Sequence, residues 1–184
     1  MEPKLKSISQ AGIGAAIAKA ERYRYLNEPE EAESICRDIL AVDATHQMSQ
    51  RILGLAITDQ FTGGTSDRFN EAAGVFNGLE EQYARCYYTG ILHERHAKAQ
   101  LRAGRPPQAV AAELEEAMRS FERAEQLRSA GNDEAILRWN RCARLLESIP
   151  QPQSADEPAG FESADTAPHH PSSHLSAVRG GRHH

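Results

Sequence analysis

The chain has 184 residues, of which 26% are charged and 40% are hydrophobic, and its formal net charge is -5 at pH 7. This is the composition of an ordinary soluble protein, and no stretch approaches the roughly 20 apolar residues that a membrane-spanning helix needs. Residues 1–150 hold 22 acidic against 19 basic side chains. The excess of basic charge that nucleic-acid binding needs is therefore missing.

The composition changes near residue 150. From Gln151 onward the chain is rich in Pro, Ser, Ala, Gly and His, and after Phe161 only Leu175 and Val178 are large apolar residues. So little apolar surface cannot offset about 1 to 2 kcal/mol of backbone entropy per ordered residue. We therefore predict a folded domain over 7–149 and a disordered tail over 150–184. The tail histidines either bind a divalent metal loosely or reflect composition alone; they are His169, His170, His174, His183 and His184.

Helical periodicity is clearest between residues 29 and 42. Apolar residues recur there at steps of three and four, which places them on one face of an amphipathic helix. Pro29 suits the first turn of this helix, and Asn27 can adopt the left-handed conformation that ends the helix before it, expected over about 8–26. Asp43 is expected to cap the next helix, over about 45–61.

Four further helices are expected along the chain. Gly63 and Gly64 mark a longer loop after the third helix, Gly104 and Pro106 mark a tight turn, and Gly131-Asn132 separate the last two helices. The expected ranges are about 68–80, 82–103, 106–127 and 133–148. The sequence therefore predicts an all-α fold of seven helices.

The first helices resemble a tetratricopeptide repeat passing into the next one. The matching residues are Ala20, Tyr23, Asn27-Glu28-Pro29-Glu30-Glu31-Ala32, Cys36, Ile39-Leu40, Asp43-Ala44 and Leu53-Gly54. The resemblance spans about 11–130 and implies antiparallel helix pairs stacked as a short right-handed α-solenoid. About three such pairs are expected, with the last helix covering the end of the stack.

The resemblance also implies a site. In this family the first helix of each pair lines a concave groove that holds a peptide or a partner helix. The groove positions carried onto this chain are Ile17, Glu21, Arg24, Tyr25, Met48, Arg51, Leu55, Asp59, Glu94, Lys98, Leu101 and Arg102. The mixture of Arg, Tyr, Met and Leu with charges is that of a protein interface, although an ordinary exposed helix row has a similar composition.

The pair His93 and His96 is the sharpest candidate for chemistry. It lacks the His-Glu-x-x-His spacing that directs two imidazoles at one metal, so we expect both rings to pack against the partner helix. A metal or enzyme site at these residues remains the alternative. The carboxylates of Glu113, Glu115, Glu116, Glu122 and Glu125 are interpreted as a solvated helix face with interleaved arginines.

The three cysteines, Cys36, Cys86 and Cys142, lie far apart on or beside apolar helix faces. They form neither a disulfide framework nor a zinc site, which fits a reducing compartment such as the cytoplasm. The run that ends at Ala18-Lys19-Ala20 superficially resembles a secretory signal. It is too polar for one, and we interpret it as part of the first helix.

These patterns favour a non-catalytic adaptor or scaffold that binds another protein or peptide in its groove, with self-association as a variant. No metal, cofactor or catalytic group is expected, because no nucleophile, base and orienting group occur together. The alternatives are a nucleic-acid-binding helical repeat and the metal or enzyme site at His93 and His96.

Overall fold

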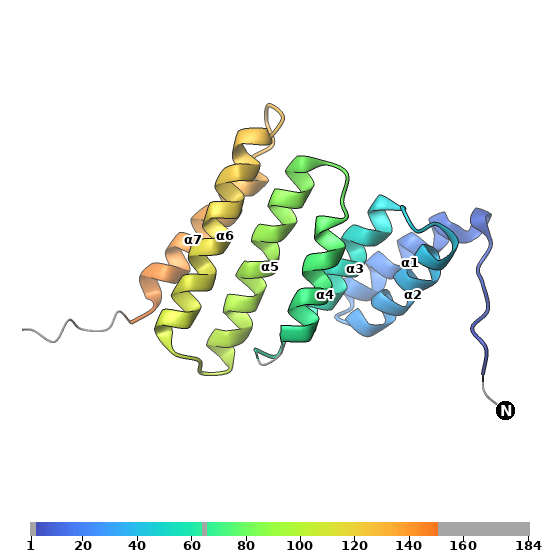
Figure 1. Ribbon diagram of the computed structural model, residues 1–184, viewed down its shortest axis with the longest axis horizontal. Helices are drawn as coiled ribbons and strands as arrows, with labels where there is room; N and C mark the ends of the chain where they lie inside the picture. Colours follow the sequence, from blue (N-terminus) through green and yellow to red (C-terminus); the bar gives the residue numbers. More distant parts are fainter. Residues whose placement is uncertain (1–2, 64–65, 151–184) are drawn as a thin grey trace, which may run out of the picture. The chain divides into compact units, whose positions relative to one another are not determined.

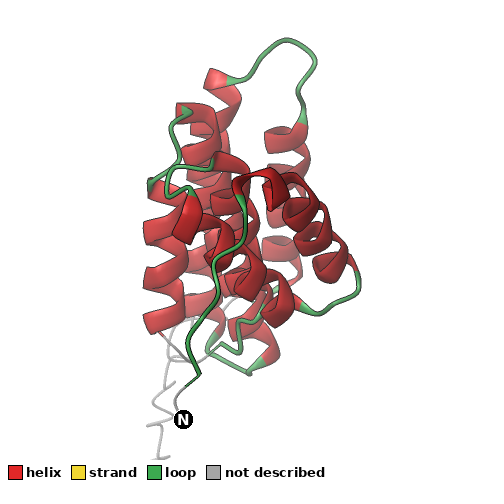
Figure 2. Ribbon diagram, turned by 90° about the vertical axis from the view of Figure 1, so that its right-hand side faces the viewer, coloured by secondary structure: helices red, strands yellow, loops and turns green. Residues whose placement is uncertain are grey.

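The regular structure of the chain is helical throughout the part that the structure describes. The computed structural model describes residues 3–63 and 66–150, and within these ranges it contains no strand (Figure 2). The elements are η1 Gln10–Gly12, α1 Ile13–Tyr25, α2 Pro29–Val42, α3 Gln47–Asp59, α4 Ser66–Asn77, α5 Gln82–Arg102, α6 Pro107–Leu127 and α7 Glu134–Ser148. The predicted all-α class and its seven helices are confirmed. Apart from Pro150, the predicted tail and all its histidines lie outside the described residues.

The corner between α1 and α2 forms as its residue types dictate. Asn27 has a φ of 61°, the left-handed conformation predicted for the end of the first helix. Pro29 is in the first turn of α2, which has the predicted bounds. Ala32, Cys36 and Ile39 on its inner face are 0% exposed. Asn27 thus specifies the end of α1, and Pro29 specifies the start of α2.

Helices α1 and α3 begin later in the chain than predicted, and in each case a side-chain hydrogen bond to the backbone marks the observed start. Ser9 Oγ accepts a hydrogen bond from Gly12 N at 3.1 Å, so a 3-10 turn precedes α1 and the α-helix begins at Ile13. His46, and not Asp43, caps α3, since its side chain accepts from Ser49 N. Asp43 Oδ1 instead accepts from Thr45 N at 3.2 Å and stabilises the turn before the helix.

The fourth helix also differs, spanning Ser66–Asn77 instead of 68–80. At its end, Gly78 N donates to the carbonyl oxygens of both Gly74 and Val75 at 3.2 Å. This shared bond tightens the last turn, as is common at helix ends, and the α-helix does not continue.

Each helix packs against the next one along the chain, as the ribbon in Figure 1 shows. In addition α1 contacts α3, and α3 contacts α5. Two apolar clusters result, and α5 contributes to both: Leu92 and Ala99 belong to the first, Ile91 and Ala97 to the second. Helix α5 is therefore covered on two sides.

Two glycines allow neighbouring helices to approach closely. A Cβ atom on Gly54 of α3 would lie 2.2 Å from the ring of Phe76 on α4, and one on Gly90 of α5 would lie 2.5 Å from the ring of Phe121 on α6. Both phenylalanines are 0% exposed. The same large-on-small contact thus joins two successive helix pairs.

The turn between α5 and α6 is built as predicted. Gly104 has a φ of 68°, which favours glycine, and a proline lies in the first turn of α6.

Among the described helices, none combines the length and the apolar character that crossing a membrane requires.

Candidate protein-binding surface

The helices α1 and α3, which contact each other, carry most of the residues predicted to line the groove. They contribute Glu21, Arg24 and Tyr25 from α1, and Met48, Arg51, Leu55 and Asp59 from α3. Tyr25 is 86% exposed and Met48 is 42% exposed, whereas Leu55 is partly buried against the core. The surface therefore presents two large apolar side chains to solvent.

Asp59 joins three helices through its carboxylate. Its Oδ2 lies 2.9 Å from Arg24 Nε of α1, and its Oδ1 lies 2.6 Å from Arg95 Nη1 of α5. Arg95 also donates to the carbonyl oxygen of Leu55 at 2.9 Å and to Thr58 Oγ1 at 2.6 Å. Burial lowers the pKa of Arg95, and the negative charge of Asp59 opposes that effect.

The Arg24–Asp59 pair also gives the direction of the two helices. Arg24 lies at the end of α1 and Asp59 at the end of α3, so the two helices run the same way. Met48, in the first turn of α3, then lies at the opposite end of the surface from Tyr25. The two exposed apolar side chains are therefore separated by most of the length of α3, along which each residue adds about 1.5 Å.

Arg51, one turn after Met48, is held less completely than Arg24. Its Nη2 lies 3.4 Å from Glu81 Oε2, at the edge of hydrogen-bonding distance. Its Nε is buried without a hydrogen-bond partner in the described part of the chain. Arg51 is therefore held by one long contact, whereas the contact that holds Arg24 is shorter.

The residues predicted on α5 do not form one exposed row. Glu94, predicted to line the groove, is 0% exposed. Its carboxylate pairs with Lys98 Nζ and, at 3.4 Å, with Arg138 Nη1 of α7. Arg102 is exposed, at the end of the helix. Glu94 thus connects α5 to α7 and does not line an exposed row.

His93 and His96 share one carboxylate on the neighbouring helix. The Nδ1 atoms of the two rings lie 2.8 and 3.3 Å from Glu113 Oε2 of α6. Their rings also pack on Phe69 of α4, with centroid distances of 5.3 and 4.8 Å. The structure therefore places both histidines against partner helices, as predicted.

Glu113 departs from the predicted solvated face. Its side chain is 24% exposed, while Glu115, Glu116, Glu122 and Glu125 are exposed. Burial by itself raises the pKa of the Glu113 carboxyl, but the hydrogen bonds from His93 and His96 outweigh burial and hold it at about 2. Within 3–63 and 66–150, no three His, Cys, Asp or Glu side chains are arranged to hold a metal ion.

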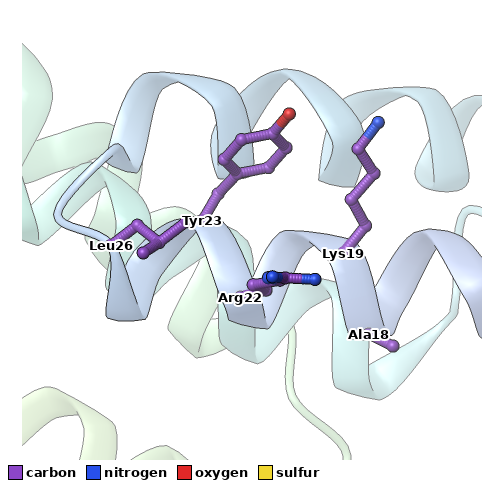
Figure 3. Close-up of a pocket in the computed structure, with 5 residues that line it drawn as sticks. All are labelled: Ala18, Lys19, Arg22, Tyr23 and Leu26. Carbon is purple, nitrogen blue, oxygen red and sulfur yellow. The ribbon is translucent and has the colours of Figure 1, made fainter.

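A pocket of about 590 Å³ that the sequence did not predict lies against a different face of α1 from Glu21 and Arg24. The described residues that line it are Ala18, Lys19, Arg22, Tyr23 and Leu26 (Figure 3). Lys19 Nζ lies 5.6 Å from the centre of the Tyr23 ring, and the two side chains extend from the same side of the helix. In the sequence, Tyr23 stands among the residues that match the repeat, and nothing there indicates a pocket.

In comparisons with protein-family models, curated proteins and solved structures, nothing matches the chain.

Proposed function

We propose that this protein is a non-catalytic interaction module, which binds a peptide or a helix of another protein on the surface formed by α1 and α3. In this proposal the helices stack as pairs in a short right-handed solenoid of the tetratricopeptide type. The contacts of α1 with α3 and of α3 with α5, each of which skips one helix, support such stacking.

One observation carries the proposal. Tyr25 and Met48 are exposed at opposite ends of a surface, and beside each of them lies an arginine, Arg24 or Arg51. Tyrosine, methionine and arginine are the residue types enriched at protein interfaces, and exposed large apolar side chains gain free energy when a partner covers them. The Arg24–Asp59 pair holds one of these guanidinium groups in place before any partner binds.

The test is affinity capture from a native lysate with the full chain as bait, compared with the Tyr25→Ala/Met48→Ala variant. These side chains make little contact with the core, so the variant is expected to keep its helical circular dichroism. The matched control is Leu137→Ala on α7, which removes another exposed apolar side chain, 66% exposed, away from the proposed surface.

We expect a protein that the wild-type and Leu137→Ala baits retain and that the double variant loses. Truncating two interface anchors costs about 1 to 2 kcal/mol each, enough to lower recovery more than tenfold. Equal recovery with all three baits, or no retained protein, would assign binding to another part of the chain or remove the proposed function.

A further inference from the structure

A pocket of about 270 Å³ lies among α4, α5 and α6, apart from the surface formed by α1 and α3. Its described lining residues are Asn77, Arg85, Cys86, Thr89, Ser120 and Arg123. Two of them carry guanidinium groups, three carry amide or hydroxyl groups, and none carries a carboxylate. The pocket is therefore positively charged and rich in hydrogen-bond donors.

Arg85 is fixed at the wall of this pocket by the backbone. Its Nη1 donates to the carbonyl oxygens of Leu79 at 2.6 Å and of Glu80 at 2.8 Å. These bonds occupy one nitrogen of the guanidinium group, and neutral carbonyl groups leave its charge uncompensated. The remaining N–H groups of Arg85 are available to a ligand.

Arg123 is also without a carboxylate partner in the described part of the chain. The charge of Arg123 contributes to lowering the pKa of Glu116, but the main partner of Glu116 is Arg119, 2.6 Å away. Two guanidinium groups that line one pocket without an acid repel each other. A bound anion would remove this repulsion.

The uncharged polar groups of the pocket are also unused. The side chains of Asn77, Thr89 and Ser120 form no hydrogen bond to any described residue. A ligand with several acceptor atoms in a small volume would satisfy all three residues.

We propose that this pocket binds a phosphate group. A phosphate offers acceptor oxygens in a tetrahedral arrangement, and guanidinium groups bind such oxygens through short, charge-assisted hydrogen bonds. Inorganic phosphate and the phosphorylated side chain of a partner protein share this chemistry. The site lies on different helices from Tyr25 and Met48, so it does not depend on the proposed function of that surface.

The pocket contains its own reporter, Cys86. The other two cysteines of the chain, Cys36 and Cys142, are buried, and burial raises the pKa of each thiol to about 12. Cys86 is only partly buried. Alkylation by neutral iodoacetamide near neutral pH should therefore modify Cys86 first, and a ligand in the pocket should slow that reaction.

The test measures the rate of Cys86 alkylation by mass spectrometry, on the full chain, as inorganic phosphate is added. Sodium chloride at equal ionic strength is the control for screening. The expected result is a saturable, several-fold slowing with phosphate alone. Arg123→Gln is expected to weaken the apparent affinity about tenfold, because a charge-assisted hydrogen bond is lost. Arg144→Gln, an exposed arginine of α7, is expected to have no effect.

A second arm replaces phosphate with a short peptide that contains phosphoserine, and its unphosphorylated form is the control. Tighter protection by the phosphopeptide than by inorganic phosphate would assign the pocket to a phosphorylated partner, and the reverse to the free ion. The proposal is overturned if sodium chloride protects as well as phosphate, if protection does not saturate, or if Arg123→Gln and Arg144→Gln behave alike.

Discussion

At Gly90 the absence of a side chain sets the distance between two helices. The ring of Phe121 occupies the space that a Cβ atom would need, and the ring is fully buried between α5 and α6. Tyr87, one turn earlier on α5, also contacts this ring, with a centroid distance of 5.8 Å. The ring therefore packs against α5 at both Tyr87 and Gly90.

We predict that Gly90→Ala lowers the free energy of unfolding by about 1 to 3 kcal/mol, the usual cost of overpacking a core. Urea denaturation followed by circular dichroism measures it. Gly74→Ala is the matched control: Gly74 also lies inside a helix, but nothing lies within 4 Å of a Cβ atom there. This change should be neutral or stabilising by up to about 1 kcal/mol, because alanine favours helix.

The reason for the cost can be tested separately. If the clash with Phe121 is responsible, Phe121→Leu in the Gly90→Ala background should cost less than Phe121→Leu alone, because the smaller side chain makes room for the methyl group. Additive effects of the two substitutions would contradict the clash.

Among the helices, charged side chains connect one element to another. Asp59 links α1, α3 and α5, Glu94 links α5 to α7, and Glu113 links α6 to α5. Glu33 of α2 similarly pairs with Arg68 of α4 at 2.5 Å. Each pair joins one position on a helix to one position on another helix.

The Glu113 carboxylate gives a prediction about pH. Its pKa is about 2 in the folded protein against an ordinary value of 4.5, so its contribution to stability is complete above pH 4.5 and disappears as the pH falls from 4.5 toward 2. Because the side chain is 24% exposed, we expect this contribution to be about 1 to 2 kcal/mol, less than the full shift implies.

The measurement is the free energy of unfolding of wild-type protein and of Glu113→Gln between about pH 3 and pH 7. The variant should be less stable at neutral pH, and the difference should shrink as the pH falls below 4.5. Glu33, whose pKa is also about 2, titrates in both proteins and cancels in this difference. Glu125→Gln, at an exposed residue without an ion pair in the described chain, serves as control. A stability difference that is independent of pH would contradict the assignment.

The helix ends were largely predictable from the sequence, because they depend on local chemistry. Asn27, Pro29 and Gly104 specify left-handed or first-turn conformations whatever surrounds them. Sequence spacing does not show which side chains meet across helices. The burial of Glu94 depends on Arg138, 44 residues later, and the partial burial of Glu113 depends on two histidines 20 and 17 residues earlier. Prediction of the groove on α5 lacked this information.

In the whole molecule, the surface formed by α1 and α3 is the one proposed to bind a partner. Helices α1 and α3 are held parallel by the Arg24–Asp59 pair and present Tyr25 and Met48 to solvent. The neighbouring helix α5 is instead covered on two sides by packing, and its Glu94 and Arg95 are committed to ion pairs within the chain. Partner binding is therefore expected at the end of the chain that carries α1 and α3.

The most direct measurement is site-specific photo-crosslinking in the native lysate, with benzoylphenylalanine at position 48 in the full chain and at position 137 as the control. Both residues are exposed and apolar, 42% and 66% exposed, so the probe should not disturb folding. If the surface formed by α1 and α3 binds a partner, we expect a defined protein adduct from position 48 that Tyr25→Ala weakens, and none from position 137. Adducts that are equal at both positions, or absent from position 48, would contradict it.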